Sequence, residues 1–125
     1  MHKDFRRADA FEVHREKGPG LVESIYEKCL IRELELQKIP AENQVVVPVE
    51  YKGFVFDEPL RLDVFVDRCL ILELKVVREV LPEHKAQLLS YMKLLNAPVG
   101  LIINFYEPVL KNGIYRLILK GADQV

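Results

Sequence analysis

The sequence has few of the features that would assign it to a specialised class of protein. Its only two cysteines, Cys29 and Cys69, form neither a CxxC motif nor a Cys/His cluster, which argues against a zinc site. Both lie among apolar neighbours, so we expect buried, reduced thiols rather than a disulfide. The net charge is −1, so no sequence-wide basic field attracts a polyanion.

Other absences narrow the choice further. No apolar run approaches the roughly 18 residues that a membrane helix needs, so we expect no membrane partner. The first residues, MHKDFRRADAF, are charged and lack the apolar core of a signal peptide, so we expect a cytoplasmic protein. We find no internal repeat, low-complexity tract, phosphate-cradling glycine loop, Ser/His/Asp arrangement or nucleotide fingerprint.

What is present suits a single folded domain over residues 1–125, because half of the residues are hydrophobic and 30% are charged. Periodicity and breakers predict helices at 4–18, 21–39 and 82–96, and strands at 43–53, 54–56, 60–66, 70–75, 99–105 and 114–120. Pro48 makes the first strand an edge strand or a bulged one. This order, α-α-β-β-β-β-α-β-β, predicts an α/β (α+β) fold in which helices pack on a central sheet.

Charged residues interrupt the apolar stretch LRLDVFVDRCLILELK, residues 60–75. We expect two strands that pair around a turn centred on Arg68. This register places Asp63 directly across from Glu73, with Cβ atoms about 5 Å apart. Side chains alternate along a strand, so Glu73 and Lys75 share one face. The same rule puts Asp63 with Phe65 and Asp67 on one face, and Leu62, Val64 and Val66 on the other.

Two opposed carboxylates on a half-buried surface destabilise a sheet, and one lysine offsets only one of them. Three arrangements relieve the repulsion: one carboxylate stays protonated, both face open solvent, or a divalent cation lies between them. In the third, the ammonium of Lys75 can orient a water or neutralise charge on a phosphate. A surface ladder of ion pairs explains Asp63, Glu73 and Lys75 equally well on spacing alone.

These residues resemble a known signature. Asp63 on one strand and Glu73-Leu74-Lys75 on the next are similar to the catalytic motif of the PD-(D/E)XK nuclease superfamily, although Leu62 replaces its proline. The segment GLVESIY, residues 20–26, has the form G-x-x-E-x-x-Y, so the chain is identified as a member of the GxxExxY protein family within that superfamily. The likeness extends through EVHREKGPG, VEYKG, HKAQLLSYMKLL and GLIINF.

The resemblance implies a restriction-endonuclease-like core: a helix, a three-strand meander, a helix and a further strand in a mixed sheet. It implies a Mg²⁺ (or Mn²⁺) site formed by Asp63, Glu73 and the backbone carbonyl of Leu74. Lys75 would position the water that hydrolyses a phosphodiester bond. The implied function is a metal-dependent nuclease acting on DNA or RNA.

Two further residues are candidates by the same likeness. Glu23 lies on the first core helix, where an acidic residue often reaches the metal in these nucleases; the alternative is a first-turn glutamate favoured by the helix dipole. Gln87 and Tyr91 resemble a Q-x-x-x-Y element that borders the active site; the alternative for Gln87 is an exposed helix residue. Tyr26 is expected to pack in the core with its hydroxyl hydrogen-bonded.

A second function competes with catalysis. A non-catalytic module with the same fold would bind nucleic acid or a partner protein without cutting it. The net charge of −1 favours this alternative, since such a chain holds a long duplex poorly unless it forms a homo-oligomer or acts with a protein partner.

Overall fold

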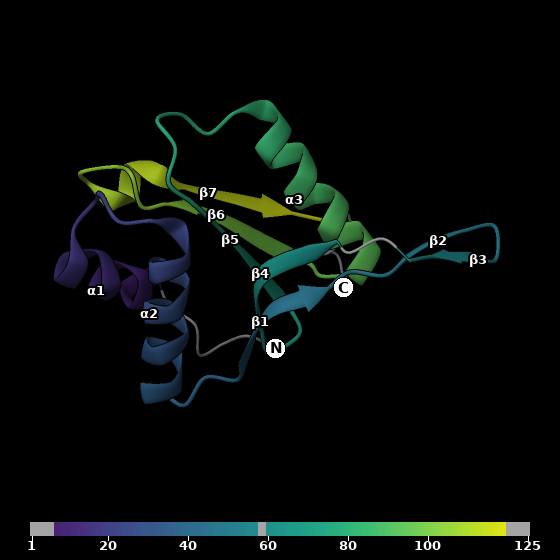
Figure 1. Ribbon diagram of the computed structural model, residues 1–125, viewed down its shortest axis with the longest axis horizontal. Helices are drawn as coiled ribbons and strands as arrows, with labels where there is room; N and C mark the ends of the chain where they lie inside the picture. Colours follow the sequence, from purple (N-terminus) through teal and green to yellow (C-terminus); the bar gives the residue numbers. More distant parts are fainter. Residues whose placement is uncertain (1–6, 58–59, 120–125) are drawn as a thin grey trace.

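The computed structural model describes residues 7–57 and 60–119. A five-stranded sheet of order β1-β4-β5-β6-β7 lies between helices, and a separate two-stranded hairpin projects from it (Figure 1). The elements are α1 (Arg7–Lys17), α2 (Glu23–Leu36), β1 (Ala41–Val46), β2 (Val49–Tyr51), β3 (Phe54–Phe56), β4 (Arg61–Val66), β5 (Leu70–Lys75), α3 (Pro82–Leu95), β6 (Val99–Asn104), the 3₁₀ helix η1 (Leu110–Gly113) and β7 (Ile114–Ile118).

The sheet is mixed. Strands β1, β4 and β5 are antiparallel neighbours, β6 runs parallel to β5 after the crossover through α3, and β7 returns antiparallel along β6. A parallel pair needs such a crossover, and a helix normally supplies it. The predicted fold class, a mixed sheet flanked by helices, is confirmed.

The helices cover the two faces of the sheet, with α1 and α2 on one side and α3 on the other (Figure 1). The α2 side is filled by apolar side chains of the central strands and helices, among them Tyr26, Leu30, Leu34, Val64, Leu72, Leu101 and Phe105. The α3 side holds a second cluster that includes Leu62, Phe65, Ile71, Leu88, Met92 and Ile102. Because both faces of the sheet are covered, β5 and β6 are almost continuously buried.

Several predicted boundaries differ from the structure. The expected strand over 43–53 splits into β1 and β2 because Pro48 has no N–H to give to a ladder. The Asn112-Gly113 pair lies in η1 rather than in a two-residue hairpin turn. The start of the first expected helix (4–6) and the end of the last expected strand (120) lie outside the described residues.

The thiols are free, as expected, although Cys29 and Cys69 are half-buried rather than buried. Among residues 7–57 and 60–119, no helix has the length and apolar character needed to span a bilayer.

Candidate active site

The pairing of β4 with β5 confirms the predicted register. Val66 is opposite Leu70, and Val64 is opposite Leu72. At the next position away from the turn, carboxylate oxygens rather than backbone carbonyls accept the hydrogen bonds of the backbone N–H groups. The N–H of Asp63 donates to Oε2 of Glu73 at 2.9 Å, and the N–H of Leu74 donates to Oδ2 of Asp63 at 2.8 Å. The two carboxylates are therefore held against each other by reciprocal bonds to backbone amides.

The expected alternation along β4 is wrong at one point. Leu62 packs with Phe65 on the α3 side, whereas Val64 packs on the α2 side. Asn43 pairs with Val64 and Val45 pairs with Leu62, but Gln44 and Asp63 between them do not pair. Gln44 also has a φ of 52°. An irregular step of this kind bends a strand and redirects its side chains. Asp63 sits at this step, which frees its N–H for Glu73.

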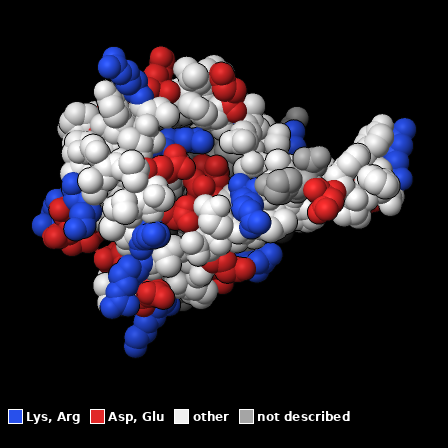
Figure 2. Space-filling model, in the orientation of Figure 1, with Lys and Arg blue, Asp and Glu red and all other residues white. Residues whose placement is uncertain are grey.

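Helix α2 adds two more carboxylates to this region. The charges of Glu23 and Glu27 both act on the β4–β5 carboxylates. Glu27 is buried, and its two oxygens accept hydrogen bonds from Asn43 (3.0 Å) and Gln44 (2.8 Å) on β1. Figure 2 shows acidic side chains gathered in the middle of this face, with basic side chains beside them.

The electrostatics of the cluster are those of crowded anions. Burial and the charge of Asp63 raise the pKa of Glu73 to about 8, and its side chain is only 5% exposed. Burial also raises the pKa of Asp63, although the Leu74 N–H opposes this change. Burial followed by the charge of Asp63 raises the pKa of Glu23. Without a cation, the site therefore retains a proton at neutral pH.

Lys75 and Tyr91 complete the surroundings. Lys75 ends β5 and is half-buried, and its charge lowers the pKa of Glu23, Asp63 and Glu73. Within the described part of the chain its ammonium makes no ion pair shorter than 4 Å, so it stands back from the carboxylates. Burial and the charges of Glu73 and Asp63 raise the pKa of Tyr91 on α3. The site thus lies between α2 and α3.

Gln87 is placed differently from the other candidates. Its side chain is exposed, and no hydrogen bond joins it to another of the described residues. It precedes Tyr91 by four residues, so the two occupy one face of α3. His84 serves the helix itself, since its Nδ1 accepts the N–H of Leu81 at 2.9 Å. Of the predicted site residues, the structure gathers Asp63, Glu73, Leu74, Lys75 and Glu23, and leaves Gln87 at the margin.

The glycine and the tyrosine of the G-x-x-E-x-x-Y segment shape the loop that precedes α2. Gly20 has a φ of 118°, which side-chain-bearing residues rarely adopt. Tyr26 is fully buried, stacks on Phe105 at 4.4 Å, and its hydroxyl donates to the carbonyl of Gly18 and accepts from the N–H of Leu21. The expected role of Tyr26 is confirmed. The two hydrogen bonds of its hydroxyl fix the loop before α2 and so position Glu23, the first residue of that helix.

Replacing Tyr26 with phenylalanine should destabilise the fold by about 1–2 kcal/mol, because the half-buried loop loses the two hydrogen bonds that join its backbone to this hydroxyl. The ring still stacks on Phe105, so the fold itself should persist. Urea denaturation measures the loss, and Tyr106→Phe, at an exposed tyrosine, is the matched control. Equal stability of Tyr26→Phe and the wild type would show that the hydroxyl does not hold the loop.

Glu27, Asn43 and Gln44 were missed by sequence reasoning. Their contacts join residues 16 and 17 positions apart, and no local pattern predicts such contacts. The one available signal was the spacing of Glu27, one helical turn after Glu23, which puts both on the same face of α2.

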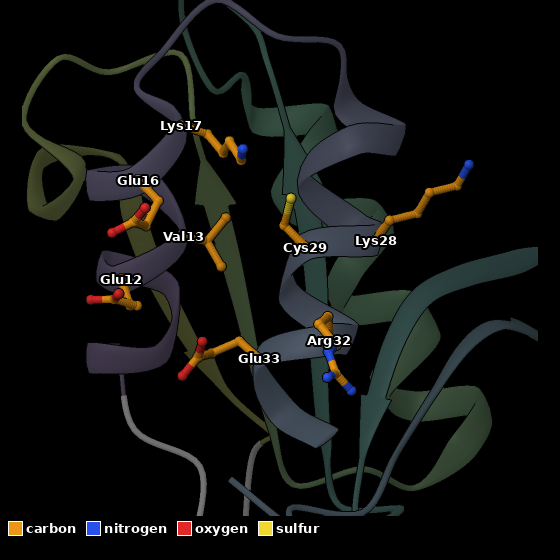
Figure 3. A pocket seen from close by; sticks show the side chains of 8 residues that line it. All are labelled: Glu12, Val13, Glu16, Lys17, Lys28, Cys29, Arg32 and Glu33. Carbon is orange, nitrogen blue, oxygen red and sulfur yellow. The ribbon is translucent and has the colours of Figure 1, made fainter. Parts of the chain in front are cut away.

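A separate cavity of about 350 Å³ lies between α1 and α2 (Figure 3). Val13 and Cys29 face the space between the helices, and charged side chains of both signs line its edges. None of the predicted site residues lines it.

The oxygen donors gathered here are of the kind that a divalent metal ion takes. Oε2 of Glu73 and Oδ2 of Asp63 each accept a backbone amide, and the side chain of Gln44 also hydrogen-bonds to the carboxylate of Asp63. A strand residue directs its N–H and C=O to the same side, so the carbonyl of Leu74 is directed toward Asp63. These are the hard oxygen donors that Mg²⁺ and Mn²⁺ prefer. Among the residues described, no group of three or more His, Cys, Asp or Glu side chains is arranged for a metal, so water and substrate oxygens would complete the shell.

A sequence model of the PD-(D/E)XK nuclease superfamily matches residues 5–117. No match was found among curated proteins, and none among solved structures.

Proposed function

Since the chain belongs to the PD-(D/E)XK nuclease superfamily, we propose that it is a metal-dependent nuclease that hydrolyses phosphodiester bonds of DNA or RNA. The superfamily supports a nuclease-like function and nucleic-acid binding in general, and its nucleases typically use divalent metals. The narrower assignment to the GxxExxY family is part of the proposal and is supported by Gly20, Glu23 and Tyr26.

One observation supports the proposal most strongly. The opposed carboxylates of Asp63 and Glu73 are fixed by backbone amides, and the pKa of both is raised. A structural ion-pair ladder would place the ammonium of Lys75 directly on them, yet no such ion pair is present among the described residues. An uncompensated acidic cluster of this kind is typical of a functional site.

Asp63, Glu73 and the carbonyl of Leu74 would hold Mg²⁺ or Mn²⁺. When bound, the ion supplies positive charge that polarises the scissile phosphate. Lys75 donates hydrogen bonds to the attacking water and orients its lone pair toward phosphorus. Its charge also stabilises the negative charge that grows on the phosphate oxygens in the transition state. Glu23 accepts hydrogen bonds from water at the edge of the site, and Gln87 is proposed to contact the substrate outside it.

The runner-up is a non-catalytic module that binds nucleic acid or a protein. The net charge of −1 is the observation in its favour, because 19 Asp and Glu offset the 18 Lys and Arg that could hold a polyanion. The two proposals share the metal site and differ in the fate of the substrate.

Metal titration tests the shared site. The wild type should bind Mg²⁺ or Mn²⁺ at concentrations below about 1 mM, and Asp63→Asn should weaken binding by at least about tenfold. Asn retains the acceptor for the Leu74 N–H, so folding is preserved. Glu79→Gln, at an exposed loop position, removes the same charge and should bind as the wild type does.

Cleavage assays then separate the two functions. Single- and double-stranded DNA and RNA are incubated with the wild type in the presence of Mn²⁺. Metal-dependent products support the nuclease, and retention of intact nucleic acid on the protein supports the module. Absence of metal binding up to several millimolar would overturn both.

A further inference from the structure

The hairpin of β2 and β3 forms an arm, defined as residues 49–57, that projects from the body (Figure 1). Among the strands that the structure describes, β2 and β3 pair only with each other, in a sheet separate from the main one. Gly53, with a φ of 83°, forms part of its turn, and the carboxylate of Glu50 accepts the N–H of Gly53 at 3.2 Å. An isolated two-stranded hairpin is at best marginally stable in water, so such an arm gains from a surface that covers it.

The register gives the arm one apolar face. Val49 is paired with Phe56 and Tyr51 with Phe54, and paired residues share a face. Tyr51 and Phe54 are each 62% exposed, and Phe56 is 40% exposed. The rings of Phe54 and Phe56 meet edge to face at 5.0 Å, which gives the face a continuous aromatic surface. Large apolar patches of this kind mark interaction sites.

Charge is distributed unevenly along the arm. Lys52 lies at the turn, with its ammonium 5.2 Å from the centre of the Tyr51 ring. Asp57 lies at the base, and it is exposed. Figure 2 shows the arm as mostly uncharged, with basic atoms at its far end and acidic atoms nearer the body. With Glu50 included, the arm carries two acids and one base, so it does not attract a phosphate backbone.

We propose that the arm is a dimerisation element and that its occupant is the arm of a second copy of this chain. The aromatic faces of the two arms pack on each other across a two-fold axis, with the arms antiparallel. This arrangement brings the tip of each arm to the base of the other. Lys52 of each chain then lies beside Asp57 of the second copy, so the charges complement each other in the antiparallel orientation and not in the parallel one.

The area indicates a weak to moderate dimer. Aromatic side chains present about 150–250 Å² each, so the exposed fractions amount to roughly 250–400 Å² of aromatic surface per arm. Two arms therefore bury about 500–800 Å² of aromatic surface, which lies below the roughly 1,200 Å² of stable interfaces and within the size range of weak ones. So small an area leaves little surplus over the cost of association, and a dissociation constant on the order of tens of micromolar follows.

The first test is the particle mass between about 1 and 200 μM, a range that brackets micromolar association. Sedimentation velocity should show the wild type rising from 14.5 kDa toward twice that mass. Phe54→Ser combined with Phe56→Ser should stay at the monomer mass throughout. Tyr106→Ser removes an aromatic ring of similar exposure on another surface and should dimerise as the wild type does.

A charge exchange tests the orientation. Lys52→Glu alone should weaken the dimer by at least about fivefold, and adding Asp57→Lys should restore it to within about threefold of the wild type. Both positions are exposed, so neither change threatens the fold. A wild type that stays monomeric at 200 μM, or an aromatic double variant that dimerises normally, would overturn the proposal. Failure of the exchange to restore association would overturn the antiparallel arrangement. A monomer whose arm variants lose only oligonucleotide binding would instead assign the arm to substrate.

Discussion

Replacing Lys75 with alanine is expected to lower metal-dependent cleavage of nucleic acid by about 100- to 1,000-fold. This range is typical for removal of one group that stabilises charge in a transition state. Metal binding should remain within a few-fold of the wild type, because the ligands are Asp63, Glu73 and the Leu74 carbonyl. The loss should appear in kcat at saturating substrate, since the ammonium acts mainly on charge that develops during the reaction.

Lys93→Ala is the matched control for this prediction. Lys93 is exposed on α3, so its removal changes the net charge equally while leaving the site intact. Cleavage by Lys93→Ala should stay within about twofold of the wild type. If Lys75→Ala cleaves as fast as Lys93→Ala, the ammonium has no part in the reaction and the mechanism proposed for it fails.

Glu73→Gln is expected to stabilise the metal-free protein by about 2–4 kcal/mol at pH 8. The glutamine keeps an acceptor for the N–H of Asp63 and removes a buried carboxylate that faces another one. The cost of ionising Glu73 inside the fold disappears with the carboxylate. Glu79→Gln, which removes an exposed carboxylate, should change stability by less than about 0.5 kcal/mol.

The sign of the pH dependence follows from the pKa of Glu73, which is about 8 in the folded protein against an ordinary value of 4.5. The folded state therefore holds this proton more tightly than the unfolded state does. The resulting stability is complete below about pH 4.5 and is lost as the pH rises toward 8, with a slope of up to about 1.4 kcal/mol per pH unit. Asp63 and Glu23 have pKa values raised in the same direction, so a smaller slope remains in the variant.

Urea denaturation in EDTA at pH 5 and pH 8 measures this effect. The wild type should be clearly less stable at pH 8 than at pH 5, and Glu73→Gln should reduce the difference. Adding Mg²⁺ or Mn²⁺ at pH 8 should restore stability to the wild type and much less to the variant, because only a carboxylate binds the ion strongly. Equal pH profiles for the two proteins would show that Glu73 ionises freely in the fold.

Much of the architecture was predictable from local patterns. The apolar runs at 70–75 and 99–105 predicted strands, and they are the central pair β5 and β6. The centre of the turn at Arg68 gave the register of β4 with β5, because a hairpin register follows from the turn. Counting residues outward from that turn then predicted that Asp63 lies opposite Glu73.

The remaining features depended on interactions that no local pattern contains. Period-two alternation assumes a regular ladder, so it misplaced Leu62 where the ladder is interrupted at Asp63. The left-handed backbone of Gln44 could not be expected at a residue that is not glycine. Helical spacing placed Gln87 on the face of Tyr91, but it could not tell how far that face extends beyond the site.

The hydrogen bonds that the Asp63 and Glu73 carboxylates accept from backbone amides have a consequence for mutagenesis. Each acid side chain stands in for a backbone partner that the neighbouring strand fails to offer. Alanine at either position would remove a hydrogen bond between β4 and β5 as well as a charge. Loss of activity in an alanine variant could then result from misfolding or from loss of a catalytic group. Only the amide isosteres, asparagine and glutamine, separate the two effects.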